Sequence, residues 1–367
     1  FKGKSAHAME MTKWLDTNYH YIVPELTRDS AFSLSSRKVF DEFKEALSLG
    51  VRTRPVLIGP VTFLAFAKAV GEKFETLLLL ERILPVYVAA LRELAGLGAE
   101  WVQIDEPVLV LEVSDTVREA VRKTYETFAR DIPGLNICLT TYFEALDDNL
   151  AVAAKLPVAA LHVDLVRAPQ QLKKILASSP ASLALSLGVV DGRNTWKTDM
   201  SQTLRILREV RSEQPVRRIW IAPSCSLSHV PIDLSMETSL DPEVASWMAY
   251  AKQKVEEIHL LRTALAQGDK AVQKELDANR KAMDSRRRSA RANVVAVRER
   301  VASIRPRDFS RGTIEHRRSL QRKRLGLPLF PTTTIGSFPQ TQDVRRARLA
   351  FKSGETSAEH YQAFLKK

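Results

Sequence analysis

The sequence predicts an α/β protein: a (β/α)8 TIM barrel that lacks about its first two units, a helical linker and the start of a second TIM barrel. Six stretches that each read as a strand and then a helix follow one another between residues 54 and 266. Their strands are almost wholly apolar, which is typical of a parallel sheet covered by helices. A closed barrel needs eight such units. We therefore expect two more units upstream of Phe1, where the chain begins without an initiator Met.

Each unit is predicted from an apolar run, a turn signal and a helical spacing of apolar residues. Gly50 and Gly98 are expected to end helices, Ser114 to cap one and Pro169 to open one. No GxGxxG or GxxxxGK[ST] motif supports the alternative, an open doubly wound sheet. The predicted strands are 54–64, 101–107, 135–143, 160–166, 183–192 and 218–227. The predicted helices are 36–49, 74–97, 113–130, 144–155, 169–177, 200–211 and 242–266.

The opening segment, EMTKWLDTNYHYIVPEL, is predicted to be an irregular loop at a functional rim, because aromatic and polar residues mix in it without a period. Lys13 is either a ligand contact or an ordinary surface lysine. Two roles also stay open for Asp16, Asn18, Tyr19 and His20, which could contact a ligand or form hydrogen bonds within the loop.

Composition excludes some classes of protein. No apolar run reaches the roughly 20 residues that a membrane-spanning helix needs. Two cysteines, Cys138 and Cys225, do not make a disulfide framework, so we expect a reducing, cytoplasmic compartment. With 367 residues and 45% hydrophobic content, the chain is long enough for a large core.

The net charge of +12 comes from one segment. Residues 279–324 hold 16 Lys and Arg against 4 Asp and Glu, and the rest of the chain is neutral. Such a segment could attract phosphate groups, or it could be a solvated helical linker. We favour the linker and do not expect a nucleic-acid partner.

The pattern after residue 268 divides the chain further. Residues 269–324 read as Arg-rich helices broken at Pro306 and Gly312, and residues 327–341 as a Thr-rich strand ending at Gly336 and Ser337. A helix, a turn and a second helix should follow. We therefore predict three parts: a barrel domain (1–268), a basic inter-barrel linker (269–326) and the opening segment of a second barrel (327–367).

Polar residues gather where the predicted strands end. In a parallel sheet these ends lie at one edge, where ligands bind. Asp, His and Cys are metal-ligand types, but the sequence has no CxxC or HxxxH pair, so a polar barrel mouth without metal is favoured over a zinc site. The residues are Asp105, Glu106, Thr140, Thr141, Tyr142, His162, Asp164, Ser224 and Cys225.

Several long words in the sequence resemble one family. EMTKWLDTNYHYIVPEL, RPVLIGPVTFL, WVQIDEPVLVLE, LTTYFE, LHVDLV, DGRNTWKTD, SCSLSHVPIDL and PTTTIGSFPQT are similar to cobalamin-independent methionine synthase. The resemblance covers essentially the whole chain and is weakest in the Arg-rich segment. It implies two facing barrels joined by a long connector. The chain would then be most of the N-terminal barrel, the connector and the opening of the catalytic C-terminal barrel.

The resemblance implies a reaction and its binding residues. The family transfers a methyl group from 5-methyltetrahydropteroyltri-L-glutamate to L-homocysteine, giving methionine, with zinc and without cobalamin. By resemblance, Lys13 contacts the folate polyglutamate, and Ile335, Gly336 and Ser337 hold homocysteine or methionine. No catalytic residue of the family lies in this chain, and we expect a cytoplasmic monomer with small-molecule substrates.

The resemblance also explains why we expect no zinc in this chain. The family's metal ligands lie in the C-terminal barrel, and the two barrels look like a duplication. At the corresponding places stand Leu139, Thr141, Asp164 and Cys225, of which Leu139 cannot bind a metal and zinc needs about four ligands. We therefore expect the chain to be inactive alone.

Two other functions remain open. One is a non-catalytic, barrel-derived binding or interaction protein whose basic segment contacts polyanions. The other is a different barrel enzyme of the same superfamily, such as a decarboxylase, against which the PTTTIGSFPQT opening of a second barrel argues.

Overall fold

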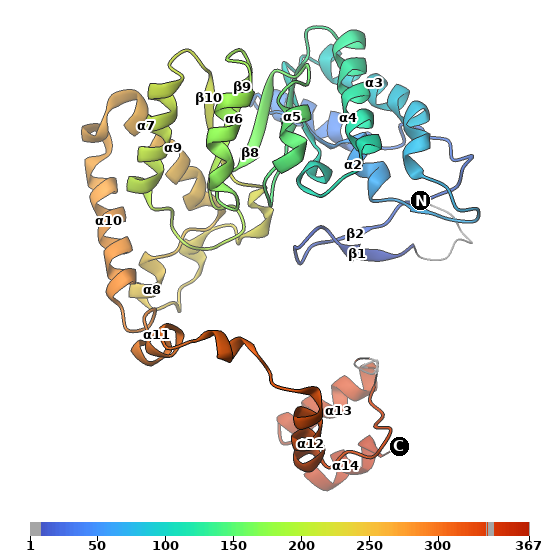
Figure 1. Ribbon diagram of the computed structural model, residues 1–367, viewed down its shortest axis with the longest axis vertical. Coiled ribbons are helices and arrows are strands. Elements are labelled where there is room, and N and C mark those ends of the chain that lie inside the picture. The colour runs from blue at the N-terminus through green and yellow to red at the C-terminus, as the bar shows by residue number, and fades with distance from the viewer. Residues whose placement is uncertain (1–8, 335, 337–340, 367) are drawn as a thin grey trace. The chain divides into compact units, whose positions relative to one another are not determined.

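A computed structural model describes residues 9–334, 336 and 341–366 of the chain. The chain divides into two compact units, residues 1–293 and residues 294–367 (Figure 1). Each unit is described by itself below.

A parallel sheet of six strands forms the centre of the first unit. Its order is β10-β9-β8-β7-β6-β4, so neighbours in the sheet follow one another along the chain. Each of the six stretches predicted as strands contains one strand of this sheet, which confirms the parallel α/β fold. The strand predicted for residues 54–64 is wrong after Gly59, where helix α2 begins. Within the described sheet β4 and β10 have one neighbour each, so a closed barrel stays a prediction. The strands are β4 (Val56–Ile58), β6 (Trp101–Asp105), β7 (Asn136–Thr140), β8 (Ala160–Asp164), β9 (Ala184–Val190) and β10 (Ile219–Pro223).

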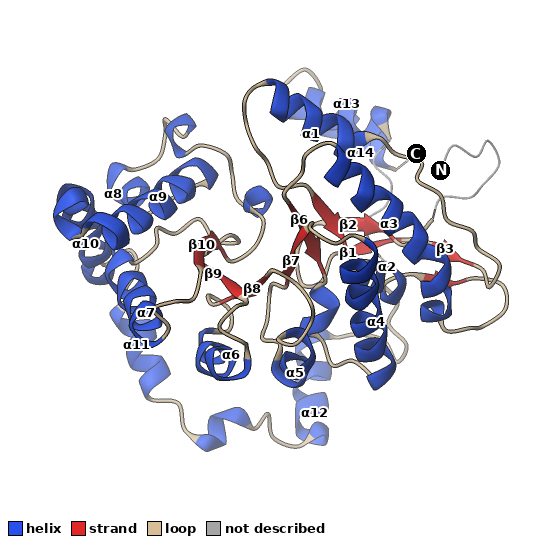
Figure 2. Cartoon of the chain, turned by 90° about the horizontal axis from the view of Figure 1, so that it is seen from above, coloured by secondary structure: helices blue, strands red, loops and turns tan. Residues whose placement is uncertain are grey.

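Helices follow these strands and cover the outer side of the sheet. Figure 2 shows strands β10 to β6 as a curved row, with α7, α6, α5 and α4 along its outer side. The helices of this unit are α1 (Lys38–Ser48), α2 (Pro60–Ala65), α3 (Leu80–Gly96), α4 (Asp115–Asp131), α5 (Leu150–Ala153), α6 (Leu172–Ser178), α7 (Met200–Glu213), α8 (Pro242–Ser246), α9 (Ala251–Gln267) and α10 (Gln273–Arg288).

The local signals in the sequence act as predicted at several helix ends. The Ser114 hydroxyl accepts a hydrogen bond from the backbone N–H of Val117 and caps α4. Gly98 follows α3 with φ of +92°, a conformation that favours glycine. Pro169 opens a 3-10 turn just before α6.

The single helix predicted for residues 242–266 is wrong at one place. The structure has two helices, α8 and α9, separated at Trp247–Tyr250. There the backbone leaves the helix to bond with another segment: Lys197 N donates to Trp247 O over 2.8 Å, and Ala249 N to Thr195 O over 2.8 Å. A tertiary backbone pairing therefore overrides the local helical spacing.

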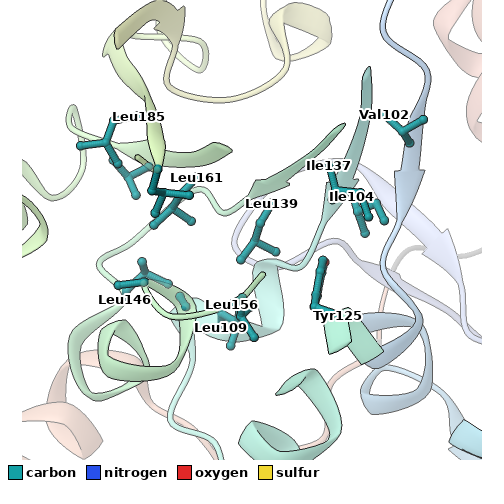
Figure 3. Close-up of a cluster of buried hydrophobic side chains, with 14 of the residues drawn as sticks. Val102, Ile104, Leu109, Tyr125, Ile137, Leu139, Leu146, Leu156, Leu161 and Leu185 are labelled. Atoms are coloured by element: carbon teal, nitrogen blue, oxygen red, sulfur yellow. The ribbon is translucent and has the colours of Figure 1, made fainter. Parts of the chain in front are cut away.

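The hydrophobic core lies between the sheet and its outer helices. Alternate side chains of the strands point outward, and Ile104, Leu139, Leu161 and Leu185 are fully buried there. Figure 3 shows Leu139 and Leu161 above Leu109, Leu146 and Leu156, with Tyr125 of α4 near Ile104. The outward-facing side chains of these strands are apolar because helices cover this face of the sheet.

The inner face of the sheet is more polar. Along the strand register, Asp105 pairs with Thr140, Thr140 with His162 and His162 with Ser186, so these four side chains form one row. The row lies at the carboxyl-terminal half of the sheet, where the sequence predicted polar groups.

The opening segment is a hairpin, so our prediction of an irregular loop is wrong there. Strands β1 (Met11–Lys13) and β2 (His20–Ile22) pair antiparallel, with Lys13 opposite His20. Each strand has only three residues and is largely exposed, which leaves no alternating apolar pattern in the sequence. The remaining two-stranded sheet pairs β3 (Glu25–Leu26) with β5 (Lys68–Ala69) in parallel.

Helix α10 belongs to the first unit, although it falls in the segment predicted to be a linker. Leu276 is buried, and Asn279 Nδ2 donates to Thr198 O over 2.8 Å while its Oδ1 accepts from Met200 N over 3.2 Å. The domain boundaries predicted above stay predictions.

Helices are the regular secondary structure found in the described residues of the second unit. It contains α11 (Val295–Ala302), α12 (Ile314–Leu325), α13 (Gln342–Lys352) and α14 (Ala358–Leu365). The last two form the predicted helix-turn-helix, with Phe351 stacked on Tyr361 at 4.7 Å between ring centroids. The Thr-rich strand is wrong over the described residues 327–334, which form no strand and expose Phe330 to 84%. A strand forms only beside a partner strand, and this segment has none among the residues described.

Across the described part of the chain, no helix is both long and apolar enough to pass through a membrane.

Candidate functional site

A cavity of about 400 Å³ opens on the inner face of the sheet, at the carboxyl ends of the strands. Its side chains come from five strands or the loops beside them. They include Arg54, Gln103, Asp105, Tyr142, His162 and Cys225.

Two successive hydrogen bonds hold the Asp105 side chain in this cavity. Arg54 donates to Gln103 Oε1 over 2.9 Å, and Gln103 Nε2 donates to Asp105 Oδ1 over 2.8 Å. Burial raises the pKa of the Asp105 carboxyl to about 6, against the opposing effects of Gln103 and Tyr142. Asp105 therefore changes its charge close to neutral pH.

Glu106, the next residue, serves a different purpose on the other side of the strand. Its carboxylate accepts hydrogen bonds from Val61 N over 3.2 Å and Thr62 N over 2.7 Å, at the start of α2. Burial raises its pKa to about 7. A Cβ on Gly59 would lie only 2.0 Å from the Glu106 carboxyl carbon, so the close packing requires glycine. The adjacent acids point to opposite sides, as strand geometry predicts.

His162 is a neutral, buried side chain in the same row. Its Nε2 lies 3.3 Å from Ser224 O, which can only accept, so Nε2 carries the proton. Its Nδ1 then accepts from the Ser186 hydroxyl over 2.9 Å. Burial lowers the pKa of His162 to about 4. Both ring nitrogens are occupied by the protein, which leaves neither available as a metal ligand.

The contacts of Leu139, Thr141, Asp164 and Cys225 do not fit a tetrahedral zinc site. Leu139 lies in the core on the outer face, and the Thr141 hydroxyl donates to His162 O over 3.0 Å. Asp164 accepts hydrogen bonds from three backbone N–H groups. Burial raises the pKa of the Cys225 thiol to about 12, which disfavours the thiolate that zinc binds. Within the described residues, no group of three or more His, Cys, Asp or Glu side chains could hold a metal ion.

Asp164 instead fixes the loops around it. Its Oδ1 accepts from Val166 N over 2.9 Å and Arg167 N over 2.8 Å, and its Oδ2 accepts from Phe143 N over 3.1 Å. Phe143 has φ of +81°, a left-handed conformation that is strained for a bulky side chain. Burial raises the pKa of Asp164, against the effect of these three N–H groups.

The opening hairpin is attached to the loops that follow the strands. Trp14 packs edge-on against Tyr21 and Phe66, and the Tyr19 hydroxyl donates to Ser228 O. Lys13 lies at the end of β1 and is exposed. No ion pair found among the described residues involves Lys13.

Comparison with known protein families decides the relationship. The family described as "Cobalamin-independent synthase, N-terminal domain" matches residues 2–215, and "Cobalamin-independent synthase, Catalytic domain" matches residues 330–367. The chain belongs to the cobalamin-independent methionine synthase family. Both ends of the chain thus match the parts that the sequence resemblance implied.

Relatives in this family share about half of the residues. The chain is 51% identical over 366 residues to the 5-methyltetrahydropteroyltriglutamate–homocysteine methyltransferase of Mesorhizobium japonicum, covering 100% of this chain and 47% of the relative. It is 51% identical over 361 residues to the protein of that name from Caulobacter vibrioides, covering 98% and 46%. The chain thus spans about half the length of these relatives.

A solved structure is also similar. It is a B12-independent methionine synthase from Shewanella sp. in complex with selenomethionine. It has 16% sequence identity and a TM-score of 0.49, and the likeness covers 73% of this chain and 75% of that one.

The structure brings some of the predicted site residues of this family member together. Asp105, Tyr142, His162 and Cys225 line one cavity. Asn18 and His20 form a hydrogen bond within the hairpin, since His20 Nδ1 lies 3.0 Å from Asn18 O. Gly336 is exposed in the second unit, and Ile335 and Ser337 lie outside the described residues.

Sequence reasoning missed two arginines. Arg167 and Arg193 follow strands β8 and β9 and reach the hairpin, where both form ion pairs with Asp16. Their signal was present in the words LHVDLVR and DGRNTW, where an arginine comes directly after a strand end.

Proposed function

We propose that this chain is the folate-binding part of a cobalamin-independent methionine synthase. In the complete enzyme, 5-methyltetrahydropteroyltriglutamate would give its methyl group to homocysteine, forming methionine. The family match and the names of the relatives support this proposal. Because the chain spans about half of those relatives, we assign it a share of the reaction and expect no turnover by the chain alone.

The observation that carries the proposal is the position of Lys13. Its exposed ammonium group lies on a hairpin attached to the carboxyl-terminal edge of the sheet, the edge where α/β proteins bind ligands. A lysine is a mobile point charge with three donors, which suits the carboxylates of a flexible polyglutamate tail. We assign Lys13 to that tail.

The second substrate would meet the other unit. We assign Ile335, Gly336 and Ser337 to homocysteine or methionine, because a glycine followed by a serine supplies backbone N–H groups and a hydroxyl that can bind a carboxylate. The match of residues 330–367 to the catalytic domain supports this assignment.

Zinc would ionise the homocysteine thiol in the complete enzyme. Since Leu139, Thr141, Asp164 and Cys225 do not fit a zinc site, we assign the metal to a part of the enzyme outside this chain. The residues of this chain would bind and orient the folate, which lowers the entropic cost of the transfer.

We further propose a cytoplasmic monomer with small-molecule substrates and no nucleic-acid partner. Several basic side chains of the Arg-rich segment are engaged within the first unit, which argues against the alternative of a polyanion-binding protein. Arg287 pairs with Asp199 at 3.1 Å, and Arg291 pairs with Asp241 at 2.9 Å. Arg286 lies 3.8 Å above the ring of Trp196.

Folate binding tests the proposal. We expect the chain to bind 5-methyltetrahydrofolate triglutamate more tightly than the monoglutamate, and Lys13→Ala to weaken the triglutamate about threefold to tenfold. Lys38→Ala is the matched control, because Lys38 is an exposed lysine on α1 that pairs with Glu42. Equal affinity of both folates, unchanged by Lys13→Ala, would refute the proposed role of the chain.

A further inference from the structure

The tip of the opening hairpin is held by two arginines on one carboxylate. Arg167 Nη2 lies 2.5 Å from Asp16 Oδ2, and Arg193 Nη1 lies 2.6 Å from Asp16 Oδ1. Arg193 Nη2 also donates to the backbone oxygen of Asp16 over 3.3 Å. Arg193 therefore donates hydrogen bonds to both the side chain and the backbone of Asp16. Charge-assisted pairs of this kind fix geometry as well as adding energy.

Arg193 is itself fixed from behind. Its guanidinium lies 4.7 Å above the ring of Phe143, whose strained backbone is held by Asp164. Its backbone N–H donates to the Asp191 carboxylate over 2.9 Å. Trp196 lies farther along the same loop. Its backbone oxygen accepts a hydrogen bond over 3.0 Å from Lys254, a fully buried side chain of α9. With 24% of its side chain exposed against 53% for Asp16, Arg193 is the more buried partner.

The hairpin transmits this anchoring to Lys13. Asp16 and Lys13 are joined by a tight turn, in which Trp14 N donates to Tyr19 O over 2.7 Å and the buried Thr17 donates to Trp14 O over 2.6 Å. Leu15 within the turn has φ of +54°, a strained conformation that persists only when neighbours hold it. The place of the Lys13 ammonium thus depends on how the tip is held.

We propose that Arg193 is a positioning residue for Lys13: through Asp16 it fixes the hairpin, and so it sets the affinity for a polyanionic tail without touching that tail. Arg167 assists from the other side of the same carboxylate. This inference rests on the proposed function, in which the tail is the polyglutamate of the folate.

The charges explain why Arg193 acts indirectly. Asp16 already occupies the guanidinium groups of both Arg167 and Arg193 at hydrogen-bond distance. A ligand carboxylate would have to displace this internal carboxylate, losing two short ion pairs to form new ones. Lys13 is the cation on the hairpin that need not exchange partners.

A double-mutant cycle separates the two roles. We expect Arg193→Gln and Asp16→Asn each to weaken triglutamate binding about threefold to tenfold and monoglutamate binding less than twofold. In a Lys13→Ala background, Arg193→Gln should have no further effect, because effects that act through one residue are not additive. Arg193→Lys should restore part of the affinity.

Two results would overturn the inference. One is that Arg193→Gln still weakens the triglutamate in the Lys13→Ala background, and the other is that Asp16→Asn strengthens binding. Either would mean that the arginines contact the tail directly.

Hydrogen exchange supplies a readout that needs no ligand. Arg193→Gln should speed exchange of the amides of residues 11–23 about tenfold, with exchange in β7 unchanged as evidence that the sheet is folded. Unchanged exchange in the hairpin would refute the positioning role even if folate binds. If the wild-type chain does not distinguish the two folates while the hairpin does loosen in the variant, the proposed function fails and the anchoring stands.

Discussion

The backbone N–H of Phe143 donates a hydrogen bond to the carboxylate of Asp164 over 3.1 Å, which joins the loop after β7 to the loop after β8. Phe143 needs this bond because its φ of +81° is unfavourable for a phenylalanine. Asp164 thus supports the backbone of the loop after β7.

Replacing Asp164 should therefore cost stability. Asp164→Ala leaves three backbone N–H groups without their acceptor, and we expect the free energy of unfolding to fall by about 2 to 4 kcal/mol. Urea denaturation monitored by circular dichroism measures this change. Asp164→Asn keeps one acceptor oxygen and should lose less; an alanine variant as stable as the wild type would contradict the supporting role.

The packing of Glu106 against Gly59 predicts a second effect. Gly59→Ala would place a Cβ 2.0 Å from the Glu106 carboxyl carbon, and we expect a loss of about 1 to 3 kcal/mol in unfolding free energy. Gly96→Ala is the matched control, since no atom of another segment lies within 4 Å of its Cβ position and it ends helix α3. In thermal melts, the unfolding midpoint of Gly59→Ala should fall. The midpoint of Gly96→Ala should stay unchanged or rise slightly.

His162 predicts how stability depends on pH. Its pKa is lowered to about 4 in the folded chain from 6.5, so between these values the unfolded chain binds the extra proton. The stability that neutral His162 contributes is complete above pH 6.5 and declines as the pH falls toward 4. Asp105 and Glu106, with pKa values raised to about 6 and about 7, act with the opposite sign over the same range.

A comparison of variants isolates the histidine. The difference in unfolding free energy between the wild type and His162→Asn should shrink by about 2 to 3 kcal/mol from pH 7 to pH 4.5. Denaturant titrations at the two pH values give this difference. A constant difference would mean that His162 does not change its charge on unfolding.

Two shortened chains test where the first unit ends. A chain that stops at Asn293 should keep the unfolding midpoint of the first unit. A chain that stops at Gly268 loses the buried Val272 and Leu276 and both hydrogen bonds of Asn279, so we expect a loss of about 4 kcal/mol or more. Equal stability of the two chains would instead support the predicted boundary at residue 268.

The sequence alone predicted the sheet well and the hairpin poorly, for a physical reason. A strand buried on both faces, such as β9, is almost wholly apolar, and that run is visible in any sequence. Strands β1 and β2 are short and exposed, and their pairing depends on contacts with segments far along the chain. The break at Trp247–Tyr250 has the same origin, since distant backbone groups decide it.

The candidate site likewise contains some features that the sequence predicted and others that it did not. Strand ends in the sequence correctly indicated that Asp105 and His162 lie together in one cavity. The pattern did not reveal that Asp164 is saturated by backbone N–H groups or that Arg193 holds Asp16, because loop conformations determine these contacts. Lys13 and the Ile335–Ser337 segment were assigned by resemblance, and those roles remain proposals.

The two cysteine thiols of the chain differ in how they are shielded from solvent, and this makes them useful reporters. Cys225 lies in a small cluster with Tyr142 and Phe143, packed beneath Trp14 and Leu15, whereas Cys138 is enclosed within the sheet. An alkylating reagent should therefore modify Cys225 whenever the hairpin lifts, and Cys138 only when the strands separate. Labelling rates followed by mass spectrometry would time these two openings separately in an unmodified chain.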